Sequence, residues 1–315
     1  MGGRRIHTIQ HKRNFIGCIN KLIQEVNIDA RAAFDQTITE FKIKNRVKRI
    51  GVFPISIDYD EFLFAARDKR VKQRSVAIRN NAPDAKIILG VDRLDYTKGI
   101  PEKLRAFKRF LTRFPEFHKK ACFIQVVVPS RRGILAYKDL KLEIEQLVGE
   151  INGVFNTHDW LPIRYMFRSL DRKELVALYR ASDIAFVTPL KDGMNLVAKE
   201  YCTCNVDETG VLILSEFAGA AQQFYTDALL VNPHDTDKTA DAILRAFEMS
   251  DREKAARMHN LREDVRTRDV MWWLNSFVTA AVRKELKGFS EPDEYFPRKP
   301  ENRGGDRERV NARNV

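Results

Sequence analysis

The sequence predicts an α/β protein built on a doubly wound parallel sheet. From about residue 85 onward, short apolar runs repeatedly precede a polar or glycine-containing turn and then a segment with helical periodicity. Such βα units are typical of a mostly parallel sheet. The chain has 315 residues, and 44% of them are hydrophobic, which is enough for a substantial core. This composition excludes a disordered chain, a collagen and a disulfide-built miniprotein. No apolar run approaches the roughly 18 to 20 residues of a membrane span.

The first βα unit begins with the apolar run Lys86–Val91, which predicts a strand. Pro101 suits the first turn of the helix that follows. The apolar residues of this helix recur at spacings of three and four and therefore share one face: Leu104, Phe107, Leu111 and Phe114. The run Phe123–Val128, closed by Pro129, predicts the next strand.

The same alternation continues to about residue 250. Helical periodicity predicts helices over Ala136–Val148, Arg172–Arg180 and Leu196–Cys204. Buried strands are predicted at Ile184–Val187, Val211–Leu214 and Leu229–Val231. The segment Asn232–Thr236 supplies caps for a helix through Phe247. Residues 251–288 predict one or two long terminal helices, which carry Trp272 and Trp273.

The formal net charge of +12 is concentrated at the two ends of the chain. Residues 1–50 carry a net +7 and residues 297–315 a net +3, whereas residues 51–296 carry only +2. There is no RNP-type aromatic motif and no zinc-finger spacing, so we interpret the excess as solvated flanks rather than a nucleic-acid site. We expect residues 289–315, which are rich in proline, glycine and charge, to form a disordered basic tail.

The four cysteines form no CxxC pair and no zinc-ligand spacing with histidine: Cys18, Cys122, Cys202 and Cys204. We therefore expect reduced thiols in a cytoplasmic protein, with no metal and no cofactor. The basic N-terminus lacks the apolar segment of a secretory signal.

Two strand-to-helix turns carry most of the chemistry, and the first is Val91–Pro101. Arg93 and Lys98 project from a strand end toward a helix N-terminus, where free N–H groups and the helix dipole favour an anion. A planar guanidinium beside an ammonium suits a phosphate or diphosphate. The alternative is that Arg93 pairs internally with Asp92 or Asp95 and that Lys98 is merely exposed.

The second turn is Thr188–Glu200. Gly193 allows the backbone to approach a ligand, and the N–H groups of Gly193, Met194 and Asn195 are placed to converge on an oxygen at the helix start. Asp192, just before them, suits sugar hydroxyls, and Glu200 is placed to accept both hydroxyls of a ribose. The alternative is an ordinary helix cap, with Asp192 in a turn and Glu200 on a solvated face.

Together these motifs resemble the trehalose-6-phosphate synthases, retaining glycosyltransferases of family 20 with two Rossmann-like domains, the arrangement called GT-B. The resemblance covers about residues 50–280 in these stretches: Phe53–Asp58, Val91–Gly99, Pro129–Gly133, Asp183–Tyr201, Gly210–Ala221 and Leu230–Pro233. The segment His7–Phe15 weakly resembles the end of the family's first domain. The resemblance implies transfer of glucose from UDP-glucose to glucose 6-phosphate, giving trehalose 6-phosphate and UDP.

The resemblance also implies a role for each candidate residue. Arg93 and Lys98 would hold the diphosphate and stabilise the charge on the leaving UDP, and Asp192 would contact the donor glucose. Glu200 would bind the ribose. The other implied donor-site residues are Arg131, Leu170 and Leu175 around the uridine and Gly193, Met194, Asn195, Leu196 and Val197 along the glucose and diphosphate. The family needs no side-chain nucleophile, so the absence of a catalytic triad is expected.

The resemblance implies a division of the chain that leaves the family's N-terminal domain largely missing. Residues 1–50 would be a remnant of that domain, 51–250 the donor-binding Rossmann-like domain, 251–288 the C-terminal crossing helices and 289–315 the tail. Most contacts to glucose 6-phosphate belong to the first domain, for which 50 residues are too few. Ser56 stands where the family usually has glycine, and Asp92 where it usually has glutamate.

Alternatives remain open from the sequence. The leading interpretation is the donor-binding half of such a UDP-forming synthase, with its activity as this shorter chain left open. The alternative is a non-catalytic regulatory subunit of a trehalose synthase complex. The partners expected are UDP-glucose, glucose 6-phosphate and either a second copy of the chain or a larger synthase complex. A related glycosyltransferase that uses ADP-glucose is a further alternative, because base contacts in this fold are partly made by the backbone.

Overall fold

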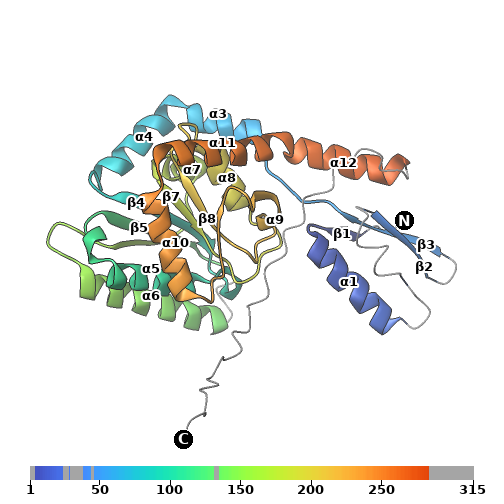
Figure 1. The fold of residues 1–315 in the computed structure, drawn as a ribbon, viewed down its shortest axis with the longest axis horizontal. Coiled ribbons are helices and arrows are strands. Elements are labelled where there is room, and N and C mark those ends of the chain that lie inside the picture. Colours follow the sequence, from blue (N-terminus) through green and yellow to red (C-terminus); the bar gives the residue numbers. More distant parts are fainter. Residues whose placement is uncertain (1–3, 24–27, 29–37, 44–45, 131–134, 284–315) are drawn as a thin grey trace, which may run out of the picture.

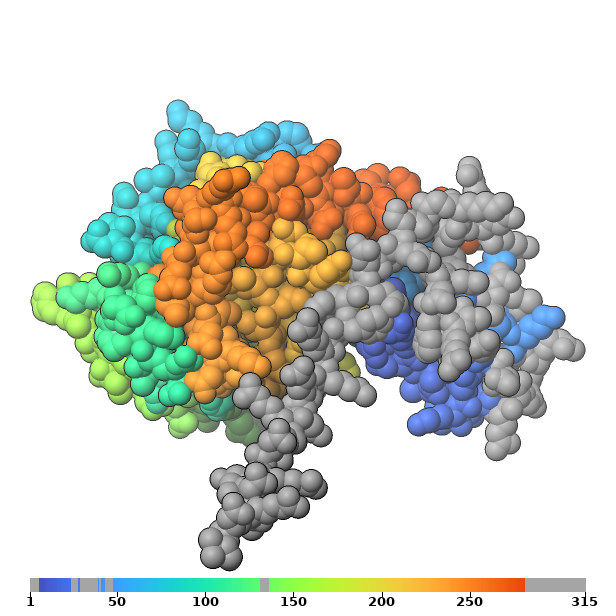
Figure 2. Space-filling view, in the orientation of Figure 1, coloured from blue at the N-terminus to red at the C-terminus, as the bar shows by residue number. Residues whose placement is uncertain are grey.

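The computed structural model describes residues 4–23, 28, 38–43, 46–130 and 135–283. Most of the described chain forms an α/β body around a six-stranded sheet, and the N-terminal segment forms a small three-stranded sheet beside it (Figure 1). In the space-filling view the C-terminal helices of the body cover much of the visible face (Figure 2).

The large sheet is entirely parallel, as the sequence predicts. Its strands lie in the order β6-β5-β4-β7-β8-β9. They are β4 (Lys86–Arg93), β5 (Ala121–Val128), β6 (Ile163–Phe167), β7 (Ile184–Val187), β8 (Val211–Ser215) and β9 (Leu229–Val231). Strands β7 and β8 are buried along their whole length, because helices cover both faces of the sheet.

Helices pack on both faces of this sheet, which makes it doubly wound (Figure 1). One face is covered by α3 (Tyr59–Arg67), α4 (Lys69–Asn80), α7 (Arg172–Ala181), α8 (Leu196–Cys204), the short α9 (Ala221–Phe224) and α11 (Asp251–Thr267). The other face is covered by α5 (Ile100–Arg113), α6 (Leu135–Phe155) and α10 (Thr236–Glu248). Three of the four residues predicted on one face of α5 are fully buried, namely Leu104, Phe107 and Leu111, whereas Phe114 lies just after the helix and is only partly buried against the same core.

The strand order fixes where a ligand is expected. The chain starts the large sheet at β4, adds β5 and β6 on one side, and then returns to place β7, β8 and β9 on the other side. The connections after β4 and β7 therefore run in opposite directions from two neighbouring strands. In open parallel sheets, ligands bind at the carboxyl ends of the strands at such a switch point.

The small sheet has the order β1-β3-β2, with β1 (Arg4–Ile6) parallel to β3 (Arg46–Val52) and β2 (Ile38–Ile43) antiparallel to it. Helix α1 (Ile9–Leu22) begins at Thr8, whose hydroxyl accepts a hydrogen bond from the His11 backbone N–H. Ile6, Ile16 and Ile50 form a separate small core. Strand β3 ends at Val52, close to the predicted boundary at residue 50.

The predicted C-terminal helices are two, α11 and α12 (Val270–Arg283), and α12 extends away from the body alongside the small sheet (Figure 1). The backbone N–H of Val270 donates to Ile57 O at 2.8 Å, and Trp273 Nε1 donates to Phe53 O at 3.2 Å. These bonds hold α12 against the segment that joins the two sheets. Residues 284–288 and the predicted tail 289–315 lie outside the described residues.

Candidate functional site

The structure brings the two predicted turns together at the switch point. The backbone N–H groups of Leu190 and Lys191, which follow β7, both donate to Thr97 O in the β4–α5 turn, at 2.8 and 3.2 Å. Gly99 makes this contact possible: its φ is +62°, and a Cβ there would lie only 2.8 Å from Thr188 O. The two turns therefore form one surface.

An ion pair joins these turns at the centre of that surface. Lys98 Nζ donates to Asp192 Oδ2 at 2.6 Å, and each side chain is only 14% exposed. Asn195 Nδ2 donates to the same oxygen at 3.1 Å. The alternative of a merely exposed Lys98 is therefore wrong. The pair places a cation and a carboxylate in one half-buried position.

Arg93, the last residue of β4, is exposed, and no described residue forms a hydrogen bond or ion pair with it. Within the described residues, no hydrogen bond or ion pair joins Arg93 to Asp92 or Asp95, although its charge contributes to the lowered pKa of Asp95. Asp92 Oδ2 accepts from Lys103 Nζ at 2.6 Å and from Gln125 Nε2 at 3.0 Å. The guanidinium of Arg93 is thus available to an anionic ligand.

Asp95 shapes the turn between the two cations. Its carboxylate accepts hydrogen bonds from the backbone N–H and the hydroxyl of Thr97, at 2.9 and 2.8 Å, and so begins a short 3₁₀ helix, η1 (Tyr96–Lys98). Partial burial raises the pKa of Asp95, but the Thr97 bonds and the charges of Lys98 and Arg93 outweigh it, so the pKa is lowered. Asp95 therefore remains ionised and holds the turn in shape.

The second turn ends in an unusual helix cap. Asn195 has a φ of +69°, and its side-chain Oδ1 accepts from the Ala198 backbone N–H at 3.2 Å. The Met194 N–H, predicted to face a ligand, donates to Asp192 Oδ1 at 3.4 Å within the turn. The apolar residues predicted near the donor are partly buried on the core around α7 and α8: Leu170, Leu175, Leu196 and Val197.

Glu200 is half-buried at the first full turn of α8, so its placement on a solvated face is wrong. Its Oε2 accepts a hydrogen bond from the Tyr179 hydroxyl at 2.7 Å. Burial raises the pKa of Glu200, although the Tyr179 bond and the charge of Arg172 oppose this rise. An ionised Glu200 therefore costs the folded protein stability.

We predict that Glu200→Gln stabilises the protein in a pH-dependent way. A glutamine never ionises and still offers an oxygen to Tyr179. Because the folded pKa lies above the ordinary value of 4.5, the penalty is absent below that value and is complete once pH has risen through the folded pKa. At about pH 8, the thermal unfolding midpoint of the variant should lie above that of the wild-type chain. At about pH 4, the two midpoints should be equal. Equal midpoints at both pH values would contradict the assignment.

Arg131, the remaining predicted residue, lies outside the described residues. Among the described residues there is no group of three or more histidine, cysteine, aspartate or glutamate side chains arranged to hold a metal ion. Within the same residues, no helix is both long and apolar enough to cross a membrane.

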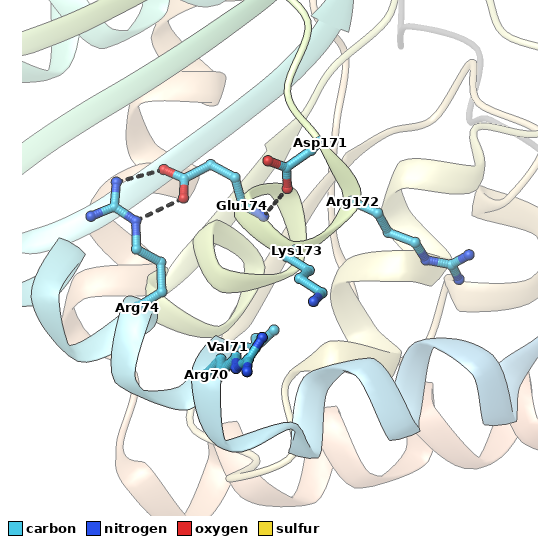
Figure 3. A pocket seen from close by; sticks show the side chains of 7 residues that line it. All are labelled: Arg70, Val71, Arg74, Asp171, Arg172, Lys173 and Glu174. Atoms are coloured by element: carbon cyan, nitrogen blue, oxygen red, sulfur yellow. Dashed lines mark hydrogen bonds and ion pairs between the residues drawn. The ribbon is translucent and has the colours of Figure 1, made fainter.

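A pocket of about 410 Å³ lies elsewhere, between α4 and the start of α7 (Figure 3). Most of its charged groups already have partners. Arg74 donates two hydrogen bonds of 2.7 Å to Glu174, and Asp171 accepts from the Glu174 backbone N–H. Arg172 pairs with Glu61. The predicted donor residues do not line this pocket, so the turns at the switch point are the better candidate site.

The structure adds one residue that the sequence reasoning did not single out. His7 follows β1 directly, and its Cδ2 lies 3.8 Å from the position a Cβ would take on Gly193. The N-terminal segment therefore reaches the second turn. The available signal was the weak resemblance of His7–Phe15 to the end of the family's first domain, which did not single out His7 as a site residue.

Comparison with known proteins decides the family. Residues 5–283 match the family model described as Glycosyltransferase family 20. The chain belongs to glycosyltransferase family 20. This confirms the family predicted from the motifs in the two turns.

Curated relatives of this family 20 chain are longer than it is. It is 39% identical over 277 residues to the bifunctional trehalose-6-phosphate synthase/phosphatase of Thermoproteus tenax, which covers 88% of this chain and 36% of that protein. It is also 39% identical over 272 residues to an α,α-trehalose-phosphate synthase [UDP-forming] of Aspergillus niger, covering 86% of this chain and 55% of the relative.

Solved structures of related proteins have the same fold. The chain superposes on the α,α-trehalose-phosphate synthase (UDP-forming) of Burkholderia xenovorans in complex with glucose-6-phosphate with a TM-score of 0.82 and 35% identity. It superposes on an E. coli protein bound with UDP-2-fluoro glucose with a TM-score of 0.81 and 33% identity. Each match covers 88% of this chain and 60% of the other. The fold prediction is confirmed, and the chain spans between 36% and 60% of these four relatives.

Proposed function

We propose that this chain carries the donor site of an α,α-trehalose-phosphate synthase (UDP-forming), and that it binds UDP-glucose at the switch point. One observation carries the proposal: Lys98 and Asp192 form an ion pair on the surface made by the two turns after β4 and β7, and Arg93 is exposed at the end of β4, where the first of these turns begins. A family 20 relative of the same fold is solved with UDP-2-fluoro glucose. The chemistry of the surface suits such a ligand, since it offers two cations to a diphosphate and a carboxylate to sugar hydroxyls.

Each described residue then has a role that agrees with its position. Arg93 and Lys98 hold the diphosphate, Asp192 contacts the glucose, and Glu200 binds the ribose. The remaining contacts come from the turn and from the partly buried apolar residues beside it: Leu170, Leu175, Gly193, Met194, Asn195, Leu196 and Val197. Arg131 is proposed near the uridine on the resemblance alone.

The ion pair must rearrange when the donor binds. A diphosphate that approaches Lys98 competes with Asp192 for the ammonium group, and Asp192 is then released toward the glucose. When the bond between glucose and UDP breaks, C1 of the glucose forms a bond to the hydroxyl oxygen of the acceptor and the hydroxyl proton passes to the departing diphosphate, on which negative charge builds up. Arg93 and Lys98 stabilise that charge, and fixed cations of this kind lower the barrier more than they tighten the ground state. The reaction needs no side-chain nucleophile for this step.

Turnover needs an acceptor as well as a donor. We propose glucose 6-phosphate as the acceptor, because the B. xenovorans relative is solved in complex with it. That relative contains more chain than the present match covers. Donor binding by the chain and transfer to the acceptor are therefore tested separately. If the chain binds the donor without transferring glucose, the result supports the alternative of a non-catalytic regulatory subunit in a larger synthase complex.

The experiment is isothermal titration of the 315-residue chain with UDP, UDP-glucose and ADP-glucose, followed by an assay of UDP release with glucose 6-phosphate. We expect UDP and UDP-glucose to bind. Preference for ADP-glucose would move the assignment to a related transferase. If circular dichroism confirms a folded protein and none of the three nucleotides binds, the proposed function is wrong.

A further inference from the structure

His7 directly follows strand β1 of the small sheet and lies close to the turn that follows strand β7 of the large sheet. In the small sheet, β1 ends at Ile6 and His7 follows it. In the large sheet, β7 leads into the turn that contains Gly193. The ring of His7 lies in ordinary contact distance of that turn, with Cδ2 3.8 Å from the position of a Gly193 Cβ. Carboxyl ends of parallel strands are where such folds present groups to ligands.

Hydrogen bonding fixes which ring nitrogen of His7 carries the proton. Phe53 O lies 3.1 Å from His7 Nδ1 and also accepts a bond from Trp273 Nε1. A carbonyl oxygen only accepts, so Nδ1 must be the donor. In the neutral ring, Nε2 is then an acceptor with a free lone pair. Within the described residues, no group bonds to Nε2, which is the ring atom next to Cδ2.

The second turn leaves room for a ligand beside the His7 ring. His11, one helical turn further along, has a lowered pKa because of burial first, and then because of His7 and Lys191. Gly193 and Lys191 are exposed, so the space beside the ring is open to solvent. A group that fills this space lies next to Gly193, which directly follows Asp192.

We propose that His7 is a substrate-contacting residue, and that its Nε2 accepts a hydrogen bond from a hydroxyl group of the donor sugar held against the Gly193 turn. The proposal rests on the proposed function, because it requires a nucleotide sugar at the switch point. It adds a contact from the small sheet to a site otherwise built from the large one. Gly193 is part of the same inference, since any side chain there would occupy the space between the ring and the turn.

Two substitutions separate this role from a structural one. His7→Asn keeps an amide N–H near Nδ1 for Phe53 O but removes the acceptor at Nε2. His7→Gln places its amide near Nε2 and gives up the bond to Phe53 O. We expect His7→Asn to raise the Kd of UDP-glucose roughly three- to tenfold and to change the Kd of UDP less than twofold. His7→Gln should raise the Kd of UDP-glucose less than His7→Asn does.

Gly193→Ala provides a second variant that leaves the bond from His7 to Phe53 untouched. Its methyl group meets only the ring of His7, so the fold should be retained, and UDP-glucose should again weaken more than UDP. His158→Asn, at an exposed histidine after α6, is the matched control and should change neither Kd.

The outcomes are distinct. The wild-type chain is expected to bind both UDP and UDP-glucose. If His7→Asn and Gly193→Ala then leave the ratio of the Kd values for these two ligands unchanged, His7 serves only to hydrogen-bond the backbone of Phe53 and the inference is wrong. If the wild-type chain binds neither UDP nor UDP-glucose, the proposed function itself fails and the inference falls with it.

Discussion

Lys98→Ala is expected to weaken UDP binding roughly 10- to 100-fold, measured by isothermal titration. The ammonium of Lys98 is only 14% exposed, and a hydrogen bond between charged groups in such a position is worth about 1.5–3 kcal/mol. The substitution also leaves the carboxylate of Asp192 without its cation, and that negative charge then faces the diphosphate. Arg93→Ala should weaken UDP less, roughly tenfold, because Arg93 is exposed and unpartnered among the described residues.

Asp192→Asn distinguishes a ligand site from a structural ion pair. The variant frees Lys98 from its partner, so the affinity for UDP should stay the same or rise, whereas the Kd of UDP-glucose should rise relative to that of UDP. Lys238→Ala, which removes a lysine that is 82% exposed on α10, is the charge control and should leave both affinities unchanged. If Lys98→Ala and Arg93→Ala bind UDP like the wild-type chain, the two cations are structural.

Lys103→Met is expected to cost about 3–5 kcal/mol of unfolding free energy, the largest stability effect that we predict. Lys103 and Asp92 form a buried ion pair, with side chains 0% and 2% exposed. Among the described residues, removing the lysine leaves the buried Asp92 carboxylate with the amide of Gln125 as its one remaining hydrogen-bond partner. Asp92 directly precedes Arg93, so the same change should also loosen the β4–α5 turn. Denaturant unfolding followed by circular dichroism measures the loss.

The double variant Asp92→Leu/Lys103→Met tests the reason for that loss. If the penalty comes from an unpaired buried charge, the removal of both charges should recover most of the stability. A double variant as unstable as Lys103→Met would show that packing of the lysine stem, rather than charge, is responsible. Exposed pairs such as Lys119 with Asp159 should cost less than about 1 kcal/mol when broken.

The sequence predicted the central strands well because each is a short apolar run bounded by turn residues. Ile184–Val187 and Leu229–Val231 coincide with β7 and β9. Strand β6 was not predicted: it lies at the edge of the sheet, most of its residues are only partly buried, and Arg164 interrupts its apolar pattern. Helix α4 was missed because its face toward the core is narrow and most of its other residues are charged or polar.

The residues of the candidate site were largely predictable, but their pairing was not. Lys98 and Asp192 are 94 positions apart, and only the strand order brings their turns together. The alternative interpretation of the sequence paired Arg93 with Asp92 or Asp95, whereas in the structure the partner of Asp92 is Lys103, eleven residues away on the following helix. His7 could not be recognised, since its contact with the Gly193 turn depends on how the small sheet packs against the large one.

The position of bound UDP in a crystal structure of this chain is the most direct test of the donor site. We expect the diphosphate within hydrogen-bond distance of Arg93 and Lys98, the ribose hydroxyls on Glu200, and a broken ion pair between Lys98 and Asp192. UDP bound elsewhere, for example in the pocket between α4 and α7, with the ion pair intact, would contradict it.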